Sequence, residues 1–150
     1  MLINGDDSIE DLVKGLNYRL VNWLDKNNLK HIKRADVAIV DSYLAGKDIY
    51  EYVSENVKTP VYIDDYNRLE YPKGIVVNGG IHAKKLDYPK KRDVTYLLGT
   101  KYIPLRKPFW DVPEKEIREE VRNVLITFGG DDIRNLTPKV LRVLRENFPA

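Results

Sequence analysis

Polar side chains that could do chemistry stand directly after four apolar runs of the sequence. The four clusters are Asp41-Ser42-Tyr43, Asp64-Asp65-Tyr66, Asn78-Gly79-Gly80 and Gly129-Gly130-Asp131-Asp132. In an open α/β sheet, ligands bind at the carboxyl ends of the strands, where loops and helix N-termini converge. If each apolar run is a strand of such a sheet, these clusters predict a binding site.

Each carboxylate cluster has a functional and a structural interpretation. Asp41 could orient a partner or cap a helix, and Tyr43 could hold a substrate hydroxyl, take part in proton transfer or simply pack. Asp64-Asp65 has the form of a paired-carboxylate site, but adjacent acids at a strand end commonly accept hydrogen bonds from turn N–H groups. No His or third acid lies near that pair in the sequence, so no metal site is expected.

The glycine turn Gly129-Gly130 lies between an apolar run and an amphipathic segment. Such a turn points backbone N–H groups at a phosphate, although a βα turn can also use glycine only for its positive φ. Asp131 and Asp132 follow and would repel a bare phosphate, and neither a Walker lysine nor a dinucleotide-binding glycine pattern is present. Neither His31 nor His82 is assigned a catalytic role.

Short apolar runs alternate with amphipathic segments along the chain. Strands are expected at 18–21, 35–41, 61–63, 74–78, 95–98 and 124–128, those at 35–41, 74–78 and 124–128 being apolar enough for buried parallel strands. Helices are expected from a capping box at 8–15, more weakly at 22–33, at 45–57 and from Thr137, as N-cap, to Phe148. The alternation predicts an α/β fold with a Rossmann-like parallel sheet.

The charge-dense stretch Glu114–Arg122 lacks apolar periodicity and is the expected domain boundary. It divides the chain into an incomplete first Rossmann-like domain with an interdomain segment, 1–118, and one β-turn-α unit, 119–150. Because both are Rossmann-like in kind, the 124–148 segment could also pack into the first sheet, since an unpaired apolar strand otherwise invites aggregation or dimerisation.

Composition bounds the class of protein. The 150 residues carry a net charge of +2 and contain no Cys, which excludes a disulfide scaffold and a thiolate metal site. No apolar run is long enough to span a bilayer and the first residues lack signal-peptide features, so a cytoplasmic protein without a membrane partner is expected. A basic block at 84–107 could attract phosphates or be an ordinary solvated surface. No nucleic-acid-binding module accompanies it, so nucleic acid is not the expected partner.

The strand-end clusters, taken in order, resemble a known family. ADVAIVDSY at 35–43 resembles the strand ending in Asp-X-Tyr of the UDP-sugar hydrolases of pseudaminic acid biosynthesis, which are related to spore-coat polysaccharide biosynthesis proteins. Ile63-Asp64-Asp65 and Val76-Val77-Asn78 match the next two strand ends. YLLGTKYIPLR at 96–106 and VLITFGGDDIRNLT at 124–137 resemble, respectively, the family's Leu-X-Gly-X-X-Tyr-X-X-Leu-Arg stretch and the opening of its second domain.

The resemblance implies the two-domain glycosyltransferase-B architecture and removal of UDP from a UDP-linked diacetamido-trideoxy hexose by water, with no metal or other cofactor required. It places Tyr43 beside the reacting sugar as an auxiliary group. It assigns Asp41, Asp64, Asp65 and Asn78 to one wall of the substrate cleft, and Gly129, Gly130, Asp131 and Asn135 to the other. Arg106 matches the pattern without a defined role.

The chain also departs from the family. The family's opening strand, its Gly-X-Gly-His loop with the presumed catalytic base, and most of its second domain have no counterpart in these residues. We therefore expect an isolated chain to be inactive, with a UDP-sugar as partner only when the site is completed. The alternatives are a glycosyltransferase-B-type sugar transferase, and a non-catalytic remnant or subunit that needs a complementary chain or forms a homodimer.

Overall fold

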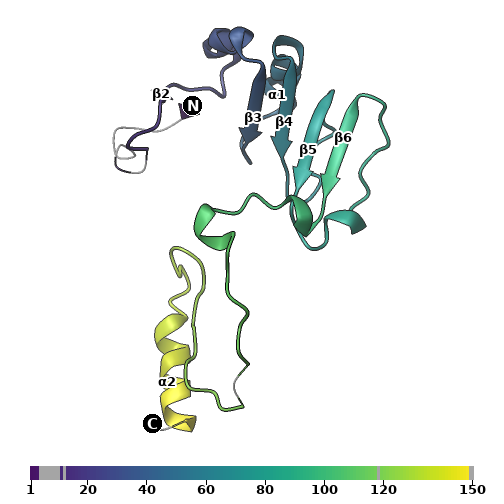
Figure 1. The fold of residues 1–150 in the computed structure, drawn as a ribbon. Helices are drawn as coiled ribbons and strands as arrows, with labels where there is room; N and C mark the ends of the chain where they lie inside the picture. The colour runs from purple at the N-terminus through teal and green to yellow at the C-terminus, as the bar shows by residue number, and fades with distance from the viewer. Residues whose placement is uncertain (4–10, 12, 118, 149–150) are drawn as a thin grey trace. The chain divides into compact units, whose positions relative to one another are not determined.

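The chain folds into two units, Met1–Trp110 and Asp111–Ala150. The structure, a computed structural model, describes residues 1–3, 11, 13–117 and 119–148. Among the described residues between Asp111 and Leu136 no helix or strand forms (Figure 1). The division falls before the charge-dense stretch at Glu114–Arg122, where the boundary was expected.

The first unit is built on a parallel four-stranded sheet in the order β3-β4-β5-β6 (Figure 1). Its strands are β3 (Val37–Asp41), β4 (Thr59–Ile63), β5 (Gly74–Asn78) and β6 (Val94–Leu98). Helix α1 (Lys47–Asn56) connects β3 to β4, whereas the later connections contain only loops and η3 (Ala83–Lys85). The predicted α/β fold with a Rossmann-like parallel sheet is confirmed.

A second, two-stranded parallel sheet pairs β1 (Leu2–Ile3) with β2 (Arg19–Leu20). Between β2 and β3 the weak helix expected at 22–33 is a 3-10 helix, η2 (Lys26–Arg34), in which the Asp25 carboxylate accepts from the Asn27 N–H at 2.9 Å. The single turns η4 (Thr100–Tyr102) and η5 (Lys107–Phe109) follow β6. The helix expected at 8–15 falls largely outside the described residues.

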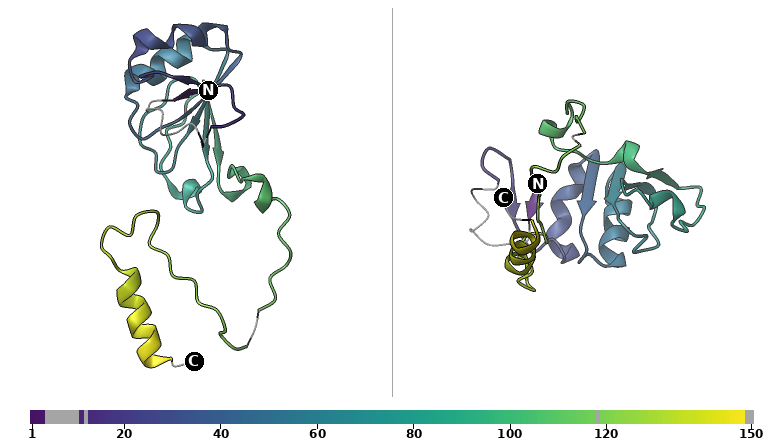
Figure 2. Two further views of the ribbon diagram at one scale, coloured as in Figure 1. Left: turned by 90° about the vertical axis from the view of Figure 1, so that its left-hand side faces the viewer. Right: turned by 90° about the horizontal axis from the view of Figure 1, so that it is seen from below.

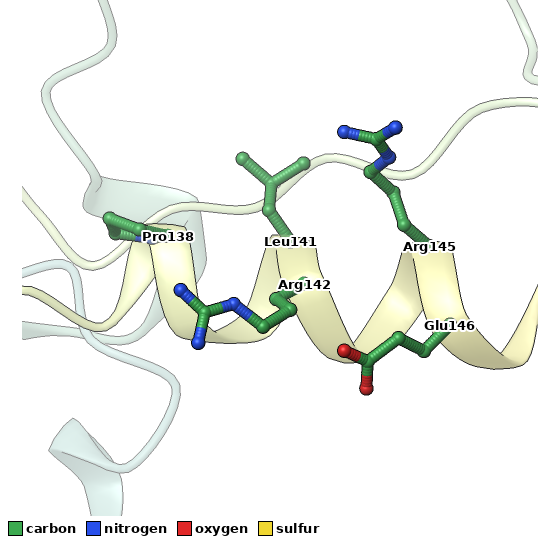
Figure 3. Close-up of a pocket in the computed structure, with 5 residues that line it drawn as sticks. All are labelled: Pro138, Leu141, Arg142, Arg145 and Glu146. Atoms are coloured by element: carbon green, nitrogen blue, oxygen red, sulfur yellow. The ribbon is translucent and has the colours of Figure 1, made fainter.

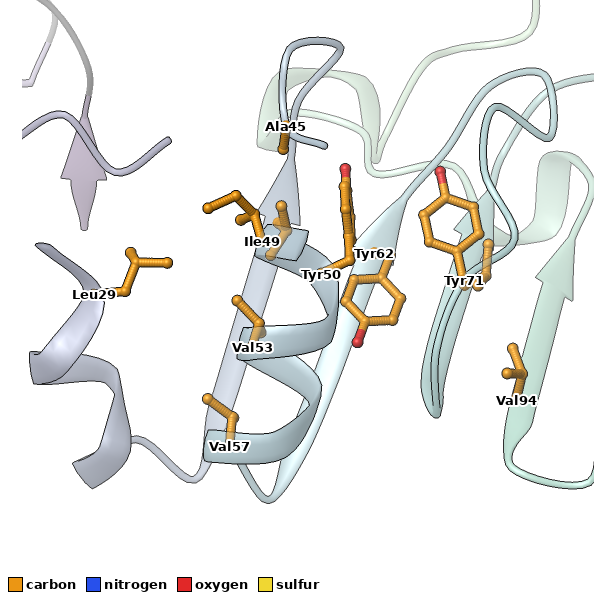
Figure 4. Packing of buried hydrophobic residues seen from close by; sticks show 11 residues of the cluster. Leu29, Ala45, Ile49, Tyr50, Val53, Val57, Tyr62, Tyr71 and Val94 are labelled. Carbon is orange, nitrogen blue, oxygen red and sulfur yellow. The ribbon is translucent and has the colours of Figure 1, made fainter. Parts of the chain in front are cut away.

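The core lies between α1 and one face of the sheet (Figure 4). Ile49 and Val53 of α1 are buried there, as is the facing Val40 of β3. Beside them, Tyr50, Tyr62 and Tyr71 are each 1% exposed or less, with ring centroids 5.2 to 5.4 Å apart. These three tyrosines are the largest fully buried side chains among the described residues, and the Tyr62 hydroxyl donates to the Lys73 carbonyl at 3.1 Å.

The expectation that 35–41 is a buried strand is wrong for one of its faces. Val37 and Ile39 are 54% and 68% exposed, while Val40 on the opposite face is buried. The physical reason is coverage: α1 packs on the face that carries Val40, whereas the side chains of Val37 and Ile39 project from the opposite face, which α1 does not cover. Sequence hydrophobicity identified the strand but could not show that one side lacks a neighbour.

The strand expected at 124–128 does not form. These residues are extended without ladder partners, and Val124 and Leu125 are exposed (Figure 2). Helix α2 (Thr137–Asn147) is present as expected, but Thr137 is not its capping residue. Instead, the carboxylate of Asp132 accepts from the N–H groups of Leu136 and Thr137 at 2.8 and 2.9 Å.

Truncating the buried Ile49 to alanine is expected to lower the free energy of unfolding of the first unit by about 2–4 kcal/mol, because it removes a core side chain and leaves a cavity. The matched control is Ile81→Ala, at a side chain that is 80% exposed, which should change stability by less than about 0.5 kcal/mol. Urea denaturation followed by circular dichroism measures both. Equal effects of the two substitutions would contradict the assigned core.

Candidate functional site

The parallel strands β3, β4 and β5 end on the same side of the sheet, and this carboxyl end, called the edge below, carries three of the predicted clusters. Asp41 at the end of β3 pairs in register with Ile63 of β4, and Ile63 pairs with Val77 of β5. The residues that follow, Asp64 and Asn78, therefore stand at neighbouring strand ends. This edge is the carboxyl end of a parallel sheet, where α/β proteins place their ligand sites.

Two of the predicted site residues are buried at this carboxyl end, and their side chains form hydrogen bonds that hold the neighbouring loops in place. Asp64 is 4% exposed and Asn78 is fully buried. The Tyr88 hydroxyl donates to the Asp64 carboxylate and accepts from the Asn78 side-chain amide at 2.9 Å. The other Asn78 side-chain atom, Oδ1, accepts from the N–H of Gly80 at 2.9 Å. A ligand would thus meet a surface that these two residues hold in place.

The Asp64 carboxylate is also bound by the turn that follows β4. It accepts from the backbone N–H of Asn67 at 2.8 Å and of Arg68 at 3.3 Å. Burial raises the pKa of Asp64, but the hydrogen bonds from Tyr88, Tyr71 and the two backbone N–H groups lower it by more, so its pKa lies below the usual range. Asp64 is therefore an ionised structural anchor at neutral pH.

A second anchor, Arg68, fixes the loop that carries Tyr43. Its guanidinium donates to the carbonyls of Ser42 and Ala45 at 3.2 and 2.9 Å and lies over the ring of Tyr50, 5.6 Å from its centroid. The Ser42 hydroxyl accepts from the N–H groups that follow, those of Leu44 and Ala45. Tyr43 thus projects from a loop held by both backbone and side-chain contacts.

The accessible part of the edge is formed by Tyr43, Asp65 and Tyr66. The Tyr43 hydroxyl donates to the Asp65 carboxylate, and the rings of Tyr43 and Tyr66 are nearly parallel with centroids 6.3 Å apart. The hydrogen bond to Asp65 and the charge of that carboxylate raise the pKa of Tyr43. At neutral pH, then, Tyr43 is a protonated hydrogen-bond donor rather than a base, beside an aromatic face and a free carboxylate oxygen.

Gly79 is required at this edge for space rather than for backbone conformation. A Cβ placed on it would lie 2.6 Å from the Cα of Ile103. The segment after β6 therefore passes directly over the turn that follows β5, and the predicted Gly79-Gly80 turn is also a point of close packing.

The second unit contains the remaining predicted residues. Gly129 has φ +83° and Asn135 has φ +50°, and a Cβ built on Gly129 or Gly130 would meet no atom within 4 Å. Gly130 and Asp131 line an open hollow of about 390 Å³ together with Arg134 and neighbouring residues. The turn is thus accessible, and Asp132 is removed from any ligand role by its capping hydrogen bonds to α2.

Other surfaces of the described residues offer less. A depression on the second unit is lined by five residues of α2, namely Pro138, Leu141, Arg142, Arg145 and Glu146 (Figure 3). Because all five come from one helix, it is an open helix surface and not a binding cleft. Within the described ranges, no group of three His, Asp or Glu side chains could hold a metal ion, and no helix there is long and apolar enough to cross a membrane.

Sequence reasoning missed the residues that hold the site together. Arg68 bonds to carbonyls 23 and 26 positions earlier, and nothing in the local pattern signals that. Tyr88 joins Asp64 to Asn78, which lie 24 and 10 positions earlier, and no local pattern signals those contacts. Its ring packs against that of Tyr96, with the centroids 5.0 Å apart.

Comparison with known proteins gives one informative match. An uncharacterized protein of Methanocaldococcus jannaschii is 33% identical over 151 aligned residues, which cover 91% of this chain and 31% of that protein. The chain thus spans about a third of the length of the relative it matches. No family model matches the chain, and no solved structure matches it.

The lowered pKa of Asp64 makes stability depend on pH in a defined direction. Its ionised form stabilises the first unit above the ordinary pKa of 3.8, and that contribution is lost as the pH falls from 3.8 through the lower folded-state pKa. Asp64→Asn is expected to cost about 1–3 kcal/mol at pH 7 and to flatten the acid limb of the stability curve. Urea titrations between pH 7 and pH 2 measure both effects.

The control for this titration is Asp87→Asn, which changes an exposed carboxylate of the same type. Its curve should follow that of the unmodified chain. If Asp64→Asn left the acid limb unchanged, Asp64 would not be the ionised anchor.

Proposed function

We propose that the chain is part of an enzyme of nucleotide-sugar metabolism that releases UDP from a UDP-linked diacetamido-trideoxy hexose, in nonulosonic acid or surface polysaccharide biosynthesis. The observation that carries this proposal is the exposed Tyr43–Asp65–Tyr66 group at the carboxyl edge of a parallel sheet. The ordered resemblance of residues 35–144 to the UDP-sugar hydrolases supports the choice of substrate.

The chemistry of this group suits a sugar. A pyranose has apolar C–H faces and a rim of hydroxyl and amide groups, so it needs an aromatic surface beside hydrogen-bonding groups. Tyr66 and Tyr43 offer ring faces, Asp65 offers acceptor oxygens, and the Tyr43 hydroxyl is a donor. Because Arg68 and Asp64 fix the two loops, little conformational entropy is lost when a ligand binds.

In the proposed hydrolysis, a water oxygen bonds to the anomeric carbon while the bond from that carbon to the UDP oxygen breaks. UDP leaves with the electron pair, and a base accepts the proton of the water. Tyr43 orients the sugar as an auxiliary group, and its raised pKa makes it unsuitable as that base. The family's base is a His of a Gly-X-Gly-His loop, which these residues do not contain, so residues 1–150 are expected to bind without turnover.

The glycine turn of the second unit supplies the other wall in this proposal. No atom lies within 4 Å of a Cβ built on Gly129 or Gly130, so a ligand could approach this turn closely. The resemblance adds Asp131 and Asn135 to the same wall.

Binding can be tested by titrating the isotopically labelled chain with UDP-N-acetylglucosamine and following amide chemical shifts. Saturable shifts are expected at residues 41–45 and 64–68. Tyr43→Phe should weaken binding about fivefold and Tyr66→Ala about tenfold, because each removes one polar or aromatic contact. The matched control is Tyr52→Phe on α1, whose affinity should equal that of the unmodified chain.

Shifts confined to other regions, or equal affinities for Tyr43→Phe and Tyr52→Phe, would refute this site. The reaction itself is read from products when the chain is supplemented with the missing Gly-X-Gly-His segment of a homologous enzyme. Free sugar and UDP support hydrolysis, whereas a product that requires an acceptor would support the sugar-transferase alternative.

A further inference from the structure

The basic block at 84–107 has no role in the site described so far, although part of it reaches the same edge. Strand β6 pairs in parallel with β5, with Leu98 opposite Asn78, so the two strands end side by side (Figure 1). The N–H of Gly99, which follows β6, donates to the carbonyl of Asn78 at 2.8 Å. The edge that carries the candidate site therefore continues to Gly99.

The side chain of Lys84 lies across this end of β6. Gly99 is buried and has φ +102°, and a Cβ built on it would lie 3.2 Å from Cε of Lys84 and within 3.9 Å of its Cγ and Cδ. The preceding residue, Ala83, is 1% exposed and fixes the backbone of η3. The aliphatic stem of Lys84 thus packs on the turn, and its ammonium, one bond beyond Cε, stands at the edge.

Other lysines of the basic block have different positions. The ammonium of Lys91 lies 2.8 Å from a carboxylate oxygen of Glu70 and donates to the Tyr71 carbonyl at 2.9 Å, so Lys91 is structural. Lys85 follows Lys84 in η3, and because a 3-10 helix has about three residues per turn, the two side chains diverge by about 120°. No ion pair forms at Lys84 among the described residues. Its charge is therefore available to an anion at the edge.

Charge changes sign along this edge. Asp41 and Asp65 are exposed at the ends of β3 and β4, whereas Lys84 lies at the end of β6. A ligand that joins an uncharged pyranose to an anionic diphosphate is therefore favoured in one orientation, with the sugar at the acidic end and the phosphates at the basic end. The reverse orientation would place the diphosphate beside two carboxylates.

The spacing of the strands suits such a ligand. Neighbouring strands lie about 4.8 Å apart, so the ends of β4 and β6 are separated by about 10 Å. In a nucleotide sugar, one oxygen joins the anomeric carbon to the first phosphorus, and a second oxygen joins the two phosphorus atoms. A pyranose beside Tyr66 at the end of β4 can therefore extend its diphosphate past β5 to Lys84.

We propose that the Lys84 ammonium binds the diphosphate of the nucleotide sugar whose pyranose lies beside Tyr43 and Tyr66. A lysine ammonium is a compact charge with three donors on a flexible stem, and it can donate to non-bridging phosphate oxygens. When the bond from the anomeric carbon to the UDP oxygen breaks, the electron pair stays with UDP, and a cation beside the phosphates stabilises that developing charge. The identity of this ligand rests on the proposed function.

The test titrates the full 150-residue chain with three probes and follows amide chemical shifts. UDP-N-acetylglucosamine is expected to shift residues 79–84 and 99–101 as well as 41–45 and 64–68. Inorganic pyrophosphate should shift only the first two segments, and N-acetylglucosamine only the last two. Lys84→Gln should weaken the binding of both phosphate probes about tenfold, because it removes a charged donor, and leave the affinity for N-acetylglucosamine unchanged.

The matched control is Lys85→Gln, which removes the same charge from the neighbouring exposed residue and should change each affinity less than about twofold, since salt screens an exposed charge away from the ligand. Lys84→Arg retains a cation and should bind the phosphate probes within about threefold of the unmodified chain. The amide spectrum of each variant without ligand verifies that the fold is intact.

Equal affinities of Lys84→Gln and Lys85→Gln for UDP-N-acetylglucosamine would overturn the role of Lys84. If the shifts at 41–45 and 64–68 remained in that case, the proposed function would stand without it. A loss of affinity for N-acetylglucosamine in Lys84→Gln would also overturn the inference, because Lys84 would then act through the fold. Pyrophosphate binding that depends on Lys84, without sugar-induced shifts at 41–45 and 64–68, would confirm the phosphate contact and refute the sugar site.

Discussion

The carboxylate of Asp64 is the interaction on which the candidate site depends. A buried charge is costly unless its oxygen atoms receive hydrogen bonds, and here the donors come from separate segments of the chain. The N–H groups of Asn67 and Arg68 bring the turn after β4 back onto the strand end, and the Tyr88 hydroxyl brings in the segment before β6. Because Tyr88 also accepts from Asn78, one anion connects the ends of β4 and β5 to the chain that leads to β6.

This anchor explains why some polar residues at the strand ends are structural and others are accessible to a ligand. Asp64 and Asp65 are adjacent and chemically identical, but strand alternation buries the first and exposes the second. The Asp64 carboxylate already accepts hydrogen bonds from the protein, so of this pair Asp65 is the one that a ligand can reach. A similar difference is found in the loop after β3. Arg68 donates to the carbonyls of Ser42 and Ala45 and so fixes the loop, while the side chain of Tyr43 between them stays exposed. Rigid support and an accessible surface are thus supplied by neighbouring residues.

The sequence predicted the elements of the first unit well and their contacts poorly. Apolar runs located β3 to β6, since a parallel strand needs side chains that can be buried on either face. The same rule failed for Val124–Phe128, because hydrophobicity shows that a segment can be a strand but not that a neighbour is present to pair with it. The strand ends could be identified as a candidate site because polar clusters directly follow the apolar runs in the sequence. Arg68 and Tyr88 could not, because their partners lie 10 to 26 positions away and are fixed only by the folded backbone.

The exposed face of β3 and the unpaired segment 124–128 are two results of the same constraint. Val37 and Ile39 project from a sheet face that α1 does not cover, and Val124 and Leu125 lie on a segment without a strand partner among the described residues, so both places have unfavourable exposed apolar surface. A neighbour that covers either place would remove the surface exposed there.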